Sequence, residues 1–526
     1  MSGAPSGDDA VILAIDLGTG GPKTAYVSLT GEVLDHEHER VEMRVLPGGG
    51  AVESPDEWWA AVVRSAGALA TRATVTPDRI VAVTCTGQWG STVPVDGGGH
   101  AVGDCLLWLD ARGRSHAARQ LGGRMAVDGY RPRAAIEWIR RAGGAPSPQG
   151  NDPLGHRLFI QHEQPDTYAA TAVFLEPVDY LNLRLTGRAA ATQATMTLSW
   201  LTNNRTLDAT DYDAVLVGLA GVDHARLPTL LPIRSIVGGV TTEAAAELGI
   251  LAGTPVTTGL PDLHSAALGS GAIDDHHGHV TISTSAWVGC HTPTKRTSLA
   301  NQMATVPSAL PGRYVLANNH DCGGVSLEWF RDHVIAPDDG LGRGEPSLAD
   351  LDTLAATVPS GAGGVMFVPW LKGERSPVAD TSMRASFLNV GIDTGRAEMV
   401  RAVLEGVSHQ LRWILDASEK VLKHPLRDLR LIGGGAQSDV WCQIQADVTG
   451  RPIGRVEQPL LANVRGAAMF AGLVTGRLQP SDLASRARVD RVFQPDPDAA
   501  ALHQDRHQLF LGIHNSQKGF YHHLNR

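Results

Sequence analysis

The sequence lacks the long apolar runs and the paired cysteines that mark membrane proteins and disulfide-stabilised secreted proteins. No apolar segment approaches the ~20 residues that a membrane-spanning helix needs, so no membrane partner is expected. The first nine residues are small, polar and acidic, without the basic and apolar regions of a signal peptide. The five cysteines contain no Cys-x-x-Cys pair, which favours buried thiols in a reducing compartment. We therefore expect a cytoplasmic protein with a short disordered N-terminal tail.

Positive charge is also scarce, with a formal net charge of −10 and no basic block. Binding to a phosphate backbone needs clustered Lys and Arg, so nucleic acid is not an expected partner. The nearest approach to a metal-binding cluster is His276, His277 and His279, in an Asp-Asp-His-His-Gly-His run. This composition is typical of a solvated turn between strands, and we favour a turn over a metal site.

The composition is otherwise that of an ordinary globular protein, with 43% hydrophobic and 19% charged residues. The 526 residues exceed the roughly 250 to 300 at which a single core stops growing. Strand-like runs alternate with amphipathic helices, which predicts an α/β protein. We expect two domains of similar size with a central cleft between them, and we place the boundary near residue 270, giving domains of residues 10–270 and 271–526.

A single carboxylate, Asp262, follows a predicted strand at residues 254–259 and precedes a predicted helix at 265–271. Strand-to-helix turns present side chains at the mouths of α/β sheets, where ligands bind. An Asp just before a helix is also a common N-cap. Taken alone, the local sequence leaves both the capping role and a catalytic role open.

Two turns in the chain share one layout, a buried strand, a bend of small residues and a second strand. In the first, residues 11–15 lead into Asp16-Leu17-Gly18-Thr19-Gly20-Gly21-Pro22-Lys23. Its N–H groups and the Thr19 hydroxyl could face a phosphate while Asp16 holds a hydrated cation; an ordinary tight hairpin is the alternative. In the second, residues 280–288, the bend contains Thr284 and Ser285. The repetition predicts an internal duplication whose two loops face one another.

A third stretch has the residue types of a sugar pocket. The predicted strand 80–86 ends in Gly87-Gln88-Trp89-Gly90, and segments 91–95 and 105–109 are expected to continue the same sheet. Hydroxyls accept and donate hydrogen bonds while sugar C–H faces stack on aromatic rings, so the candidate substrate contacts are Gln88, Trp89, Trp108 and Asp110. The alternative to a sugar pocket is that Trp89 and Trp108 are core residues and that Gln88 is a turn residue.

Near the C-terminus, a predicted strand at 429–432 meets Gly433-Gly434-Gly435-Ala436 before a helix at about 438–448. Glycine has no side chain, so a planar or anionic ligand can approach the backbone closely at the start of this helix. This pattern favours a nucleotide-binding site. The turn lacks the Lys and Ser/Thr of a P-loop, so that motif is excluded. Another predicted helix begins at Ser54, and one is entered at Asp179-Tyr180-Leu181 and stops at Gly187. The remaining predicted helices cover residues 397–420, 463–473 and 499–523.

In this order and spacing the motifs resemble those of the FGGY carbohydrate kinases, over residues 11–523. The resemblance is carried by Asp16-x-Gly-Thr with Lys23, Pro55-x-x-Trp58, Gly87-Gln88, Trp108-x-Asp110-x-Arg112, Pro261-Asp262, Gly373-Glu374-Arg375-Ser376-Pro377, Arg401-Ala402-Val403-Leu404-Glu405-Gly406 and Gly433-Gly434-Gly435-Ala436. The xylulokinase-like branch is the most similar, because Gly87-Gln88 stands where glycerol kinases carry an Arg-Glu pair.

The resemblance implies two actin-like (ribonuclease H-like) domains, with ATP between them and a ketose or polyol in the first domain. It implies ATP and Mg²⁺ as cofactors, D-xylulose as the first expected substrate, and it is compatible with a homodimer. Asp262 resembles the family's general base. Asp16 and Asp262 are the residues expected to lie at the metal ion. The expected cofactor-binding residues are Asp16, Gly18, Thr19 and Lys23 in the first loop, Thr284 and Ser285 in the second, and Gly433, Gly434, Gly435 and Ala436 at adenosine. The alternatives are a kinase for ribulose, erythritol or a related sugar, and a catalytically silent actin-like nucleotide-binding protein.

The sequence departs from the family pattern in three places. The branch's Gln-Met-His-Gly is Gln88-Trp89-Gly90-Ser91, which removes a sugar-contacting His. The Gly expected before Thr284 is Ser283, and the expected Lys-x-x-Trp segment reads His156-Arg157-Leu158-Phe159-Ile160. We expect the phosphoryl-transfer chemistry to survive these changes and the substrate specificity to be affected by them.

Overall fold

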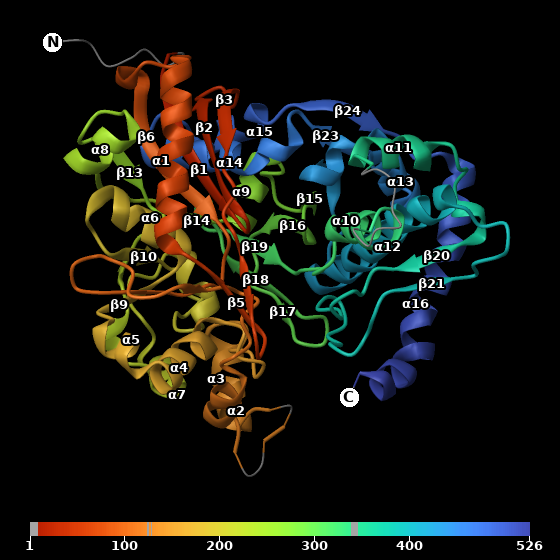
Figure 1. The fold of residues 1–526 in the computed structure, drawn as a ribbon, viewed down its shortest axis with the longest axis horizontal. Helices are drawn as coiled ribbons and strands as arrows, with labels where there is room; N and C mark the ends of the chain where they lie inside the picture. The colour runs from red at the N-terminus through yellow and green to blue at the C-terminus, as the bar shows by residue number, and fades with distance from the viewer. Residues whose placement is uncertain (1–8, 124–125, 128, 338–345, 526) are drawn as a thin grey trace.

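The protein was studied as a computed structural model, which describes residues 9–123, 126–127, 129–337 and 346–525. The predicted disordered tail therefore falls, except for Asp9, outside the described residues. Two mixed sheets form the centres of the two halves of the molecule (Figure 1). The first has the order β12-β13-β6-β1-β2-β3, with β14 also paired to β6. The second has the order β17-β18-β19-β16-β15-β22-β23-β24.

The strands of the first sheet are β1 (Val11–Gly18), β2 (Gly21–Ser28), β3 (Val33–His38), β6 (Ile80–Gly87), β12 (Ile236–Gly239), β13 (Pro255–Thr257) and β14 (Leu260–Pro261). Those of the second are β15 (His277–Ile282), β16 (Ala286–Thr292), β17 (Thr297–Ser298), β18 (Met303–Pro307), β19 (Tyr314–Ala317), β22 (Arg427–Ile432), β23 (Ile453–Val456) and β24 (Val489–Phe493).

The two sheets share a central arrangement. In the first, β1 and β2 form an antiparallel hairpin, and β6 lies parallel to β1 on its other side. In the second, β15 and β16 form the hairpin, and β22 lies parallel to β15. A glycine stands at the end of the parallel neighbour in both cases: β6 ends at Gly87, and Gly433 directly follows β22. The two sheets thus have the matching layouts that the repeated sequence pattern predicted.

Side chains of β1 alternate between two helical layers, as expected for a strand buried on both faces. Val11, Leu13, Ile15 and Leu17 belong to the core with α1 (Pro55–Arg72), α6 (Pro177–Thr186) and α8 (Thr242–Leu248). Ile12 and Ala14 belong to a separate core with α14 (Ala462–Val474). Asp16 has the same parity as Ile12 and Ala14. Its side chain therefore lies on the face covered by α14 and by the neighbouring α9 (Asp262–Gly269).

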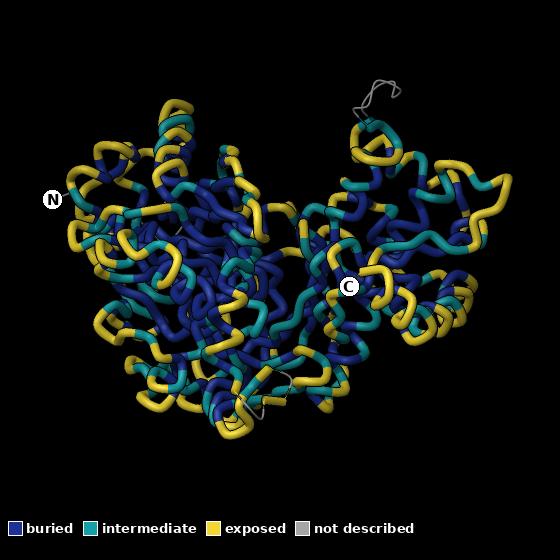
Figure 2. Tube along the Cα trace, turned by 60° about the horizontal axis from the view of Figure 1, so that its bottom comes forward, coloured by how far each residue is buried: buried dark blue, intermediate teal, exposed yellow. Residues whose placement is uncertain are grey.

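The second sheet packs against a larger helical layer whose centre is α12 (Arg396–Leu422). The helix was predicted at residues 397–420, and its apolar face is buried between the sheet and the helices α10 (Val325–Phe330), α11 (Leu348–Ala356) and α13 (Asp439–Thr449). The last helix, α16 (Pro497–Leu524), runs along the outside of α12 and α13 (Figure 1). Buried chain fills the interior of both halves, and the exposed residues lie around the periphery (Figure 2).

Capping residues set several helix ends where the sequence predicted them. The Ser54 side chain accepts from the Glu57 N–H at the start of α1, and Pro55 follows at the first helical position. The Ser438 side chain accepts from the Trp441 N–H and begins α13. At the other end, α6 stops at Gly187, which adopts the left-handed conformation that glycine favours.

One prediction about the first sheet is wrong. Segments 91–95 and 105–109 do not extend it: β7 (Val93–Val95) pairs with β9 (Val173–Leu175), and β8 (Cys105–Leu106) pairs with β5 (Gly50–Glu53). The reason is that both edges of β6 are already taken, by β1 on one side and by β13 and β14 on the other. The chain after Gly87 therefore turns away and builds small separate sheets over the end of the main one.

The other elements border these layers. They are β4 (Arg44–Leu46), β10 (Ala190–Thr192), β11 (Thr229–Leu231), β20 (Met366–Val368), β21 (Ser386–Leu388), α2 (Arg114–Leu121), α3 (Pro132–Arg141), α4 (Pro153–Glu163), α5 (Pro165–Ala170), α7 (Ala214–Ala220) and α15 (Leu483–Arg486), with short helical turns between some of them. Among the described residues, no helix is both long and apolar enough to cross a bilayer.

The histidines at 276–279 lie at the start of β15. His279 is completely buried without a hydrogen-bond partner, and His276 stacks on His424 with 3.9 Å between ring centroids. Within the described part of the chain, no group of three or more His, Cys, Asp or Glu residues could hold a metal ion. The histidines pack as turn and strand residues.

Candidate active site

Strand register brings three predicted site residues to one edge of the first sheet. Leu17 of β1 pairs with Gly87 of β6, and Gly87 pairs with Pro261 of β14, all in parallel strands. Asp16, Gln88 and Asp262 are each one residue from these positions. They therefore meet at the carboxyl ends of the strands, where α/β sheets bind ligands.

Asp262 is the first residue of α9, and Pro261 occupies the capping position. The N-cap interpretation is therefore wrong: the carboxylate makes no capping hydrogen bond, and its Oδ1 accepts only from the N–H of Leu263 at 2.7 Å. Its Oδ2 has no hydrogen-bond donor among the residues the structure describes. The helix α9 fixes the backbone of Asp262, and the Oδ2 atom of its carboxylate is free to contact a ligand.

Two carboxylates share this site. Asp16 is 3% exposed, and burial raises its pKa, opposed by the charge of Lys23 at 3.7 Å and a hydrogen bond from the Asn463 side chain. Burial and the nearby charge of Asp16 together raise the pKa of Asp262 to about 7. The single positive charge of Lys23 cannot offset the negative charges of both carboxylates. The arrangement favours a cation beside Asp16 and a proton acceptor at Asp262.

The first loop is supported by a buried residue that the sequence analysis missed. Glu53 is fully buried and accepts hydrogen bonds from Trp58 Nε1 at 2.7 Å, Gln88 Nε2 at 3.0 Å and the Gly20 N–H at 3.3 Å. It thus ties the first loop and the Gln88 turn to α1. A lone Glu just before a Ser-Pro helix start is typical of a solvated surface, so no pattern singled it out.

The exposed Thr19 hydroxyl lies against Trp108, whose Nε1 is 3.4 Å from Thr19 Oγ1. The guanidinium of Arg375, in the Gly373–Pro377 motif, lies 5.8 Å from the Trp108 ring and forms an ion pair with Asp321 at 3.3 Å. The motif thereby contacts Trp108, the neighbour of the first loop, from the other half of the chain. Trp108 is placed between the predicted phosphate loop and the second half.

Asp110 is held by partners within the protein. It is completely buried, and both oxygens accept from Arg112, with the shortest contact 2.6 Å, while Oδ2 also accepts from the Ala51 N–H at 3.0 Å. Asp110 thus fixes Arg112 and the β5 strand, and its predicted contact with a substrate stays a prediction. The Trp-x-Asp-x-Arg spacing is explained by this internal pair.

The altered turn after Gln88 is held by buried groups. Gly90 has a φ of +80°, and Glu176 Oε2 accepts from the N–H groups of Gly90 and Ser91 at 3.0 and 3.2 Å. Trp89 Nε1 donates to the Thr195 carbonyl at 2.8 Å, and its ring meets His264 edge-on at 5.9 Å. Trp89 thus lies next to the helix that Asp262 begins.

The second loop and the triple-glycine turn are in contact. A Cβ added at Gly433, where φ is +90°, would lie 2.4 Å from the Ile282 carbonyl oxygen, and one at Gly435 would lie 2.5 Å from Ile282 Cγ2. A Cβ at Gly434 would meet no atom within 4 Å. The turn therefore packs on the end of β15 through two glycines and leaves the third open, as a binding surface for a planar ligand requires.

Thr284 is exposed and Ser285 is half-buried in the bend that follows. The backbone of Ser283 is held on both sides, since its N–H donates to the Ser285 carbonyl at 2.9 Å and its carbonyl accepts from the Gly324 N–H at 2.6 Å. This second departure from the family pattern is therefore accommodated by an ordered bend. Among the predicted cofactor residues, Ala436 is buried beneath the turn.

The third departure has a structural role at His156. The fully buried imidazole contacts Thr92 Oγ1 through Nδ1 at 3.1 Å and the Asp110 carbonyl through Nε2 at 3.2 Å. Burial lowers the pKa of His156 to about 4, so the ring is neutral and can donate to one partner while it accepts from the other. It joins α4 to the segment that carries Trp108.

Comparison with known families agrees with this geometry. Residues 11–269 match the N-terminal domain of the FGGY family of carbohydrate kinases, and residues 278–474 match its C-terminal domain. The chain belongs to the FGGY family. It is accordingly a sugar kinase with two actin-like domains, as the sequence motifs predicted, and kinases of this family use ATP as the phosphate donor.

Individual relatives differ in their substrates. A xylulose kinase from Staphylococcus epidermidis is 27% identical over 514 residues, covering 97% of each chain. A gluconokinase from Bacillus licheniformis is 25% identical over 486 residues, covering 90% of this chain and 89% of the relative. The crystal structure of gluconate kinase from Lactobacillus acidophilus aligns with a TM-score of 0.83 at 22% identity, covering 98% of this chain and 99% of the other.

Proposed function

We propose that this FGGY kinase transfers the γ-phosphoryl group of ATP to a hydroxyl of D-xylulose, with Asp262 as the general base. The observation that carries the proposal is the carboxylate of Asp262, which has one oxygen without a protein donor at the edge where Asp16 and Gln88 also end. D-xylulose is favoured because xylulose kinases recur among the similar proteins. Gluconokinases are also similar, so the assay below includes gluconate.

Phosphoryl transfer requires positioning of the acceptor, neutralisation of charge and a base for the hydroxyl proton. Asp262 would take the proton of the attacking hydroxyl at its free oxygen. The N–H groups of the first loop and the hydroxyls of Thr19, Thr284 and Ser285 would hold the transferring group. Trp89, which packs beside α9, and Trp108 would form apolar walls for the sugar.

The residues present fit the cofactors that this chemistry uses. Asp16 and Asp262 are near enough for the charge of one to raise the pKa of the other, and one cation would offset that repulsion. Asp16 would hold hydrated Mg²⁺, which neutralises phosphate charge when it is bound. The open backbone of Gly434 would lie against adenosine, with Gly433, Gly435 and Ala436 shaping the turn.

We assign sugar binding to residues 10–270 and nucleotide binding to residues 271–526. The assignment is supported by Asp16, Gln88 and Asp262 in the first sheet and by the glycine turn after β22 in the second. One element of the second range crosses over, because α14 packs on the first sheet and places Asn463 against Asp16. Asn463 is therefore a residue of the second range that contacts the carboxylate proposed to hold Mg²⁺.

The raised pKa of Asp262 predicts the pH dependence of the reaction. Protonated Asp262 cannot accept a proton, so kcat/KM for the sugar is expected to fall about tenfold per pH unit below the pKa of Asp262, which is about 7 before Mg²⁺ binds and lower with Mg²⁺ beside Asp16. The substitution Asp16→Asn removes the neighbouring negative charge, which lowers the pKa of Asp262 in the Mg²⁺-free protein. Initial rates between pH 5 and 9 measure the profile of the unmodified protein, and carboxyl-carbon NMR titration without Mg²⁺ compares the Asp262 midpoint in the two proteins. An identical midpoint in the two proteins would rule out the coupling.

Substrate identity is tested with purified protein in a coupled ADP-release assay. The panel contains D-xylulose, ribulose, erythritol and gluconate, with ATP alone as the control. We expect the largest kcat/KM with D-xylulose, because several of the similar proteins are named xylulose kinases. A higher kcat/KM with another sugar would overturn D-xylulose as the substrate, but it would still support the proposed sugar kinase activity. ATP binding without stimulation by any sugar would favour a silent nucleotide-binding protein.

A further inference from the structure

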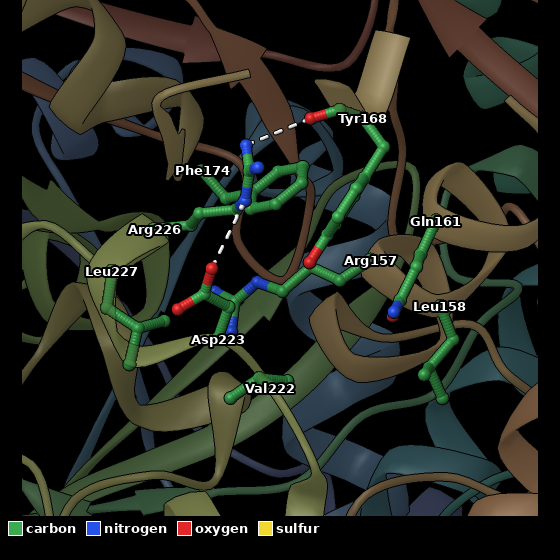
Figure 3. A pocket seen from close by; sticks show the side chains of 9 residues that line it. All are labelled: Arg157, Leu158, Gln161, Tyr168, Phe174, Val222, Asp223, Arg226 and Leu227. Carbon is green, nitrogen blue, oxygen red and sulfur yellow. Dashed lines mark hydrogen bonds and ion pairs between the residues drawn. The ribbon is translucent and has the colours of Figure 1, made fainter. Parts of the chain in front are cut away.

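Arg375 differs from an arginine that the protein satisfies with its own groups. Arg226 is of the satisfied kind: in the small cavity between α4, α5 and the turn after α7, it pairs with Asp223 at 3.4 Å and donates to the Tyr168 carbonyl at 2.9 Å (Figure 3). That cavity has room for about one water and is not a ligand site. The Arg375 side chain, in the Gly373–Pro377 motif, is instead 41% exposed.

The Arg375 side chain lies beside the first loop, although it comes from the other half of the chain. Its guanidinium carbon is 5.8 Å from the centre of the Trp108 ring, and Trp108 Nε1 is 3.4 Å from the hydroxyl of Thr19. Thr19 itself is exposed. The guanidinium is therefore separated from the predicted phosphate loop by a single aromatic ring.

Buried groups fix the backbone from which this side chain extends. Glu374 is 4% exposed, and its Oε1 accepts from the N–H groups of Arg375 at 2.7 Å and Ser376 at 3.3 Å. Its Oε2 is 2.6 Å from Nδ1 of His320, which is completely buried. The Ser376 hydroxyl donates to the Gln302 carbonyl at 3.0 Å. The protein thus holds the Arg375 backbone in place and leaves the charged end of the side chain accessible.

The same anchor connects Arg375 to the second loop. His320 exchanges backbone hydrogen bonds of 2.8 and 2.9 Å with Ala286, the residue that follows Ser285. Asp321, next to His320 in the chain, forms the ion pair with Arg375 at 3.3 Å. Arg375 is therefore positioned from the second loop and lies close to the first.

The guanidinium of Arg375 retains hydrogen-bond donors for a ligand. Among the residues that the structure describes, its partners are one carboxylate oxygen of Asp321 and the face of Trp108. The ion pair is made by Nη2, and the same Asp321 oxygen also accepts from Asn319 Nδ2 at 2.5 Å. The planar fork of an arginine matches phosphate oxygens in geometry and charge. The remaining N–H groups are available to a phosphate between the two loops.

We propose that Arg375 is a further catalytic residue, whose guanidinium binds the γ-phosphoryl group of ATP between the two loops. This assignment rests on the proposed kinase function. Negative charge is spread over the γ-phosphoryl oxygens in the transition state, and a fixed guanidinium neutralises part of it. The sugar oxygen bonds to phosphorus as the bond from phosphorus to the β-phosphate oxygen breaks, the hydroxyl proton passes to Asp262, and Arg375 stays protonated throughout.

Steady-state kinetics with D-xylulose and ATP test the role of Arg375. The substitution Arg375→Met removes the charge and keeps a long side chain, and it is expected to lower kcat by at least about a hundredfold. Arg375→Lys keeps the charge without the planar fork, so its kcat should fall between those of the other two proteins. The control Arg384→Met changes an exposed arginine that donates to the Thr381 carbonyl, and its kcat should stay within a factor of about two.

Calorimetry provides a readout that a merely structural role of Arg375 would not produce. ADP with aluminium fluoride imitates the transferring phosphoryl group, whereas ADP alone lacks it. With Mg²⁺ and D-xylulose present, Arg375→Met should weaken binding of the ADP–aluminium fluoride complex by about a hundredfold and leave ADP affinity within about threefold. Equal losses for both ligands would overturn the proposal, because they would indicate a general disturbance of the nucleotide site.

The kinetic outcomes separate this role from the proposed function itself. If the unmodified protein phosphorylates none of the sugars, the kinase assignment fails and the role of Arg375 fails with it. If the unmodified protein is active and Arg375→Met keeps near-normal kcat, only the role of Arg375 is overturned. A defect of Arg375→Met confined to KM for gluconate would also overturn it, because the guanidinium would then bind the carboxylate of that substrate.

Discussion

The substitution Asp262→Asn is expected to lower kcat for sugar phosphorylation by at least about a hundredfold, because a positioned general base is lost. Asn is nearly isosteric and can still accept from the Leu263 N–H, so α9 should keep its start. ATP binding, measured by calorimetry, should remain largely intact, since the glycine turn that would hold adenosine lies in the second sheet. The expected signature is a loss of turnover without a loss of nucleotide affinity.

A matched control separates this effect from a general change of helix charge. Asp56 also lies in the first turn of a helix, but its side chain is 79% exposed on α1. The substitution Asp56→Asn should leave kcat unchanged within a factor of about two. If Asp262→Asn retained near-normal turnover, Asp262 would not be the base, and the chemistry would have to be assigned to another group.

The substitution Gly433→Ala is expected to destabilise the second domain by about 2–4 kcal/mol. The added Cβ would lie 2.4 Å from the Ile282 carbonyl oxygen, and the backbone at φ +90° is strained for any residue with a side chain. Because β15 and β22 are central strands of the second sheet, displacement of this turn would disturb the core. Urea unfolding in the absence of nucleotide measures the change.

The neighbouring substitution Gly434→Ala is the matched control for stability and a test of the ligand site. Its Cβ would meet no protein atom within 4 Å, so the unfolding midpoint should stay close to that of the unmodified protein. The same methyl group would project into the space proposed for adenosine and should raise KM for ATP. Equal loss of stability in both variants would contradict the packing of the glycine turn. An unchanged KM for ATP in Gly434→Ala would show that adenosine does not bind against Gly434.

Much of the fold follows from local patterns in the sequence. The two hairpins were predictable because each has a buried strand, a bend of small residues and a second strand, and the helix start at Ser54 was predictable from its cap and the following Pro55. The long helix α12 was predictable from its apolar periodicity. These signals depend on neighbouring residues only, and tertiary contacts did not override them.

The site was predicted less completely because its remaining parts depend on contacts between distant segments. Glu53 contacts Gln88 and Gly20 only in the folded protein, because these residues are far apart in the sequence. Asn463 reaches Asp16 from a helix more than 400 residues away in the sequence. Asp110 was predicted to bind substrate because its residue type suits a sugar, and the sequence did not reveal that both of its oxygens accept from Arg112. A motif identifies which residues matter, and only packing decides whether a polar side chain faces a ligand or another side chain.

The central claim, that this chain transfers phosphate from ATP to a ketose, is tested most directly by stoichiometry. Purified protein is incubated with ATP, Mg²⁺ and D-xylulose, and both ADP and phosphorylated xylulose are quantified over time. We predict one phosphorylated sugar for each ADP released, at a rate far above that of ATP hydrolysis without sugar. ADP release that is independent of D-xylulose and of the other sugars tested, with no phosphorylated product, would contradict the account.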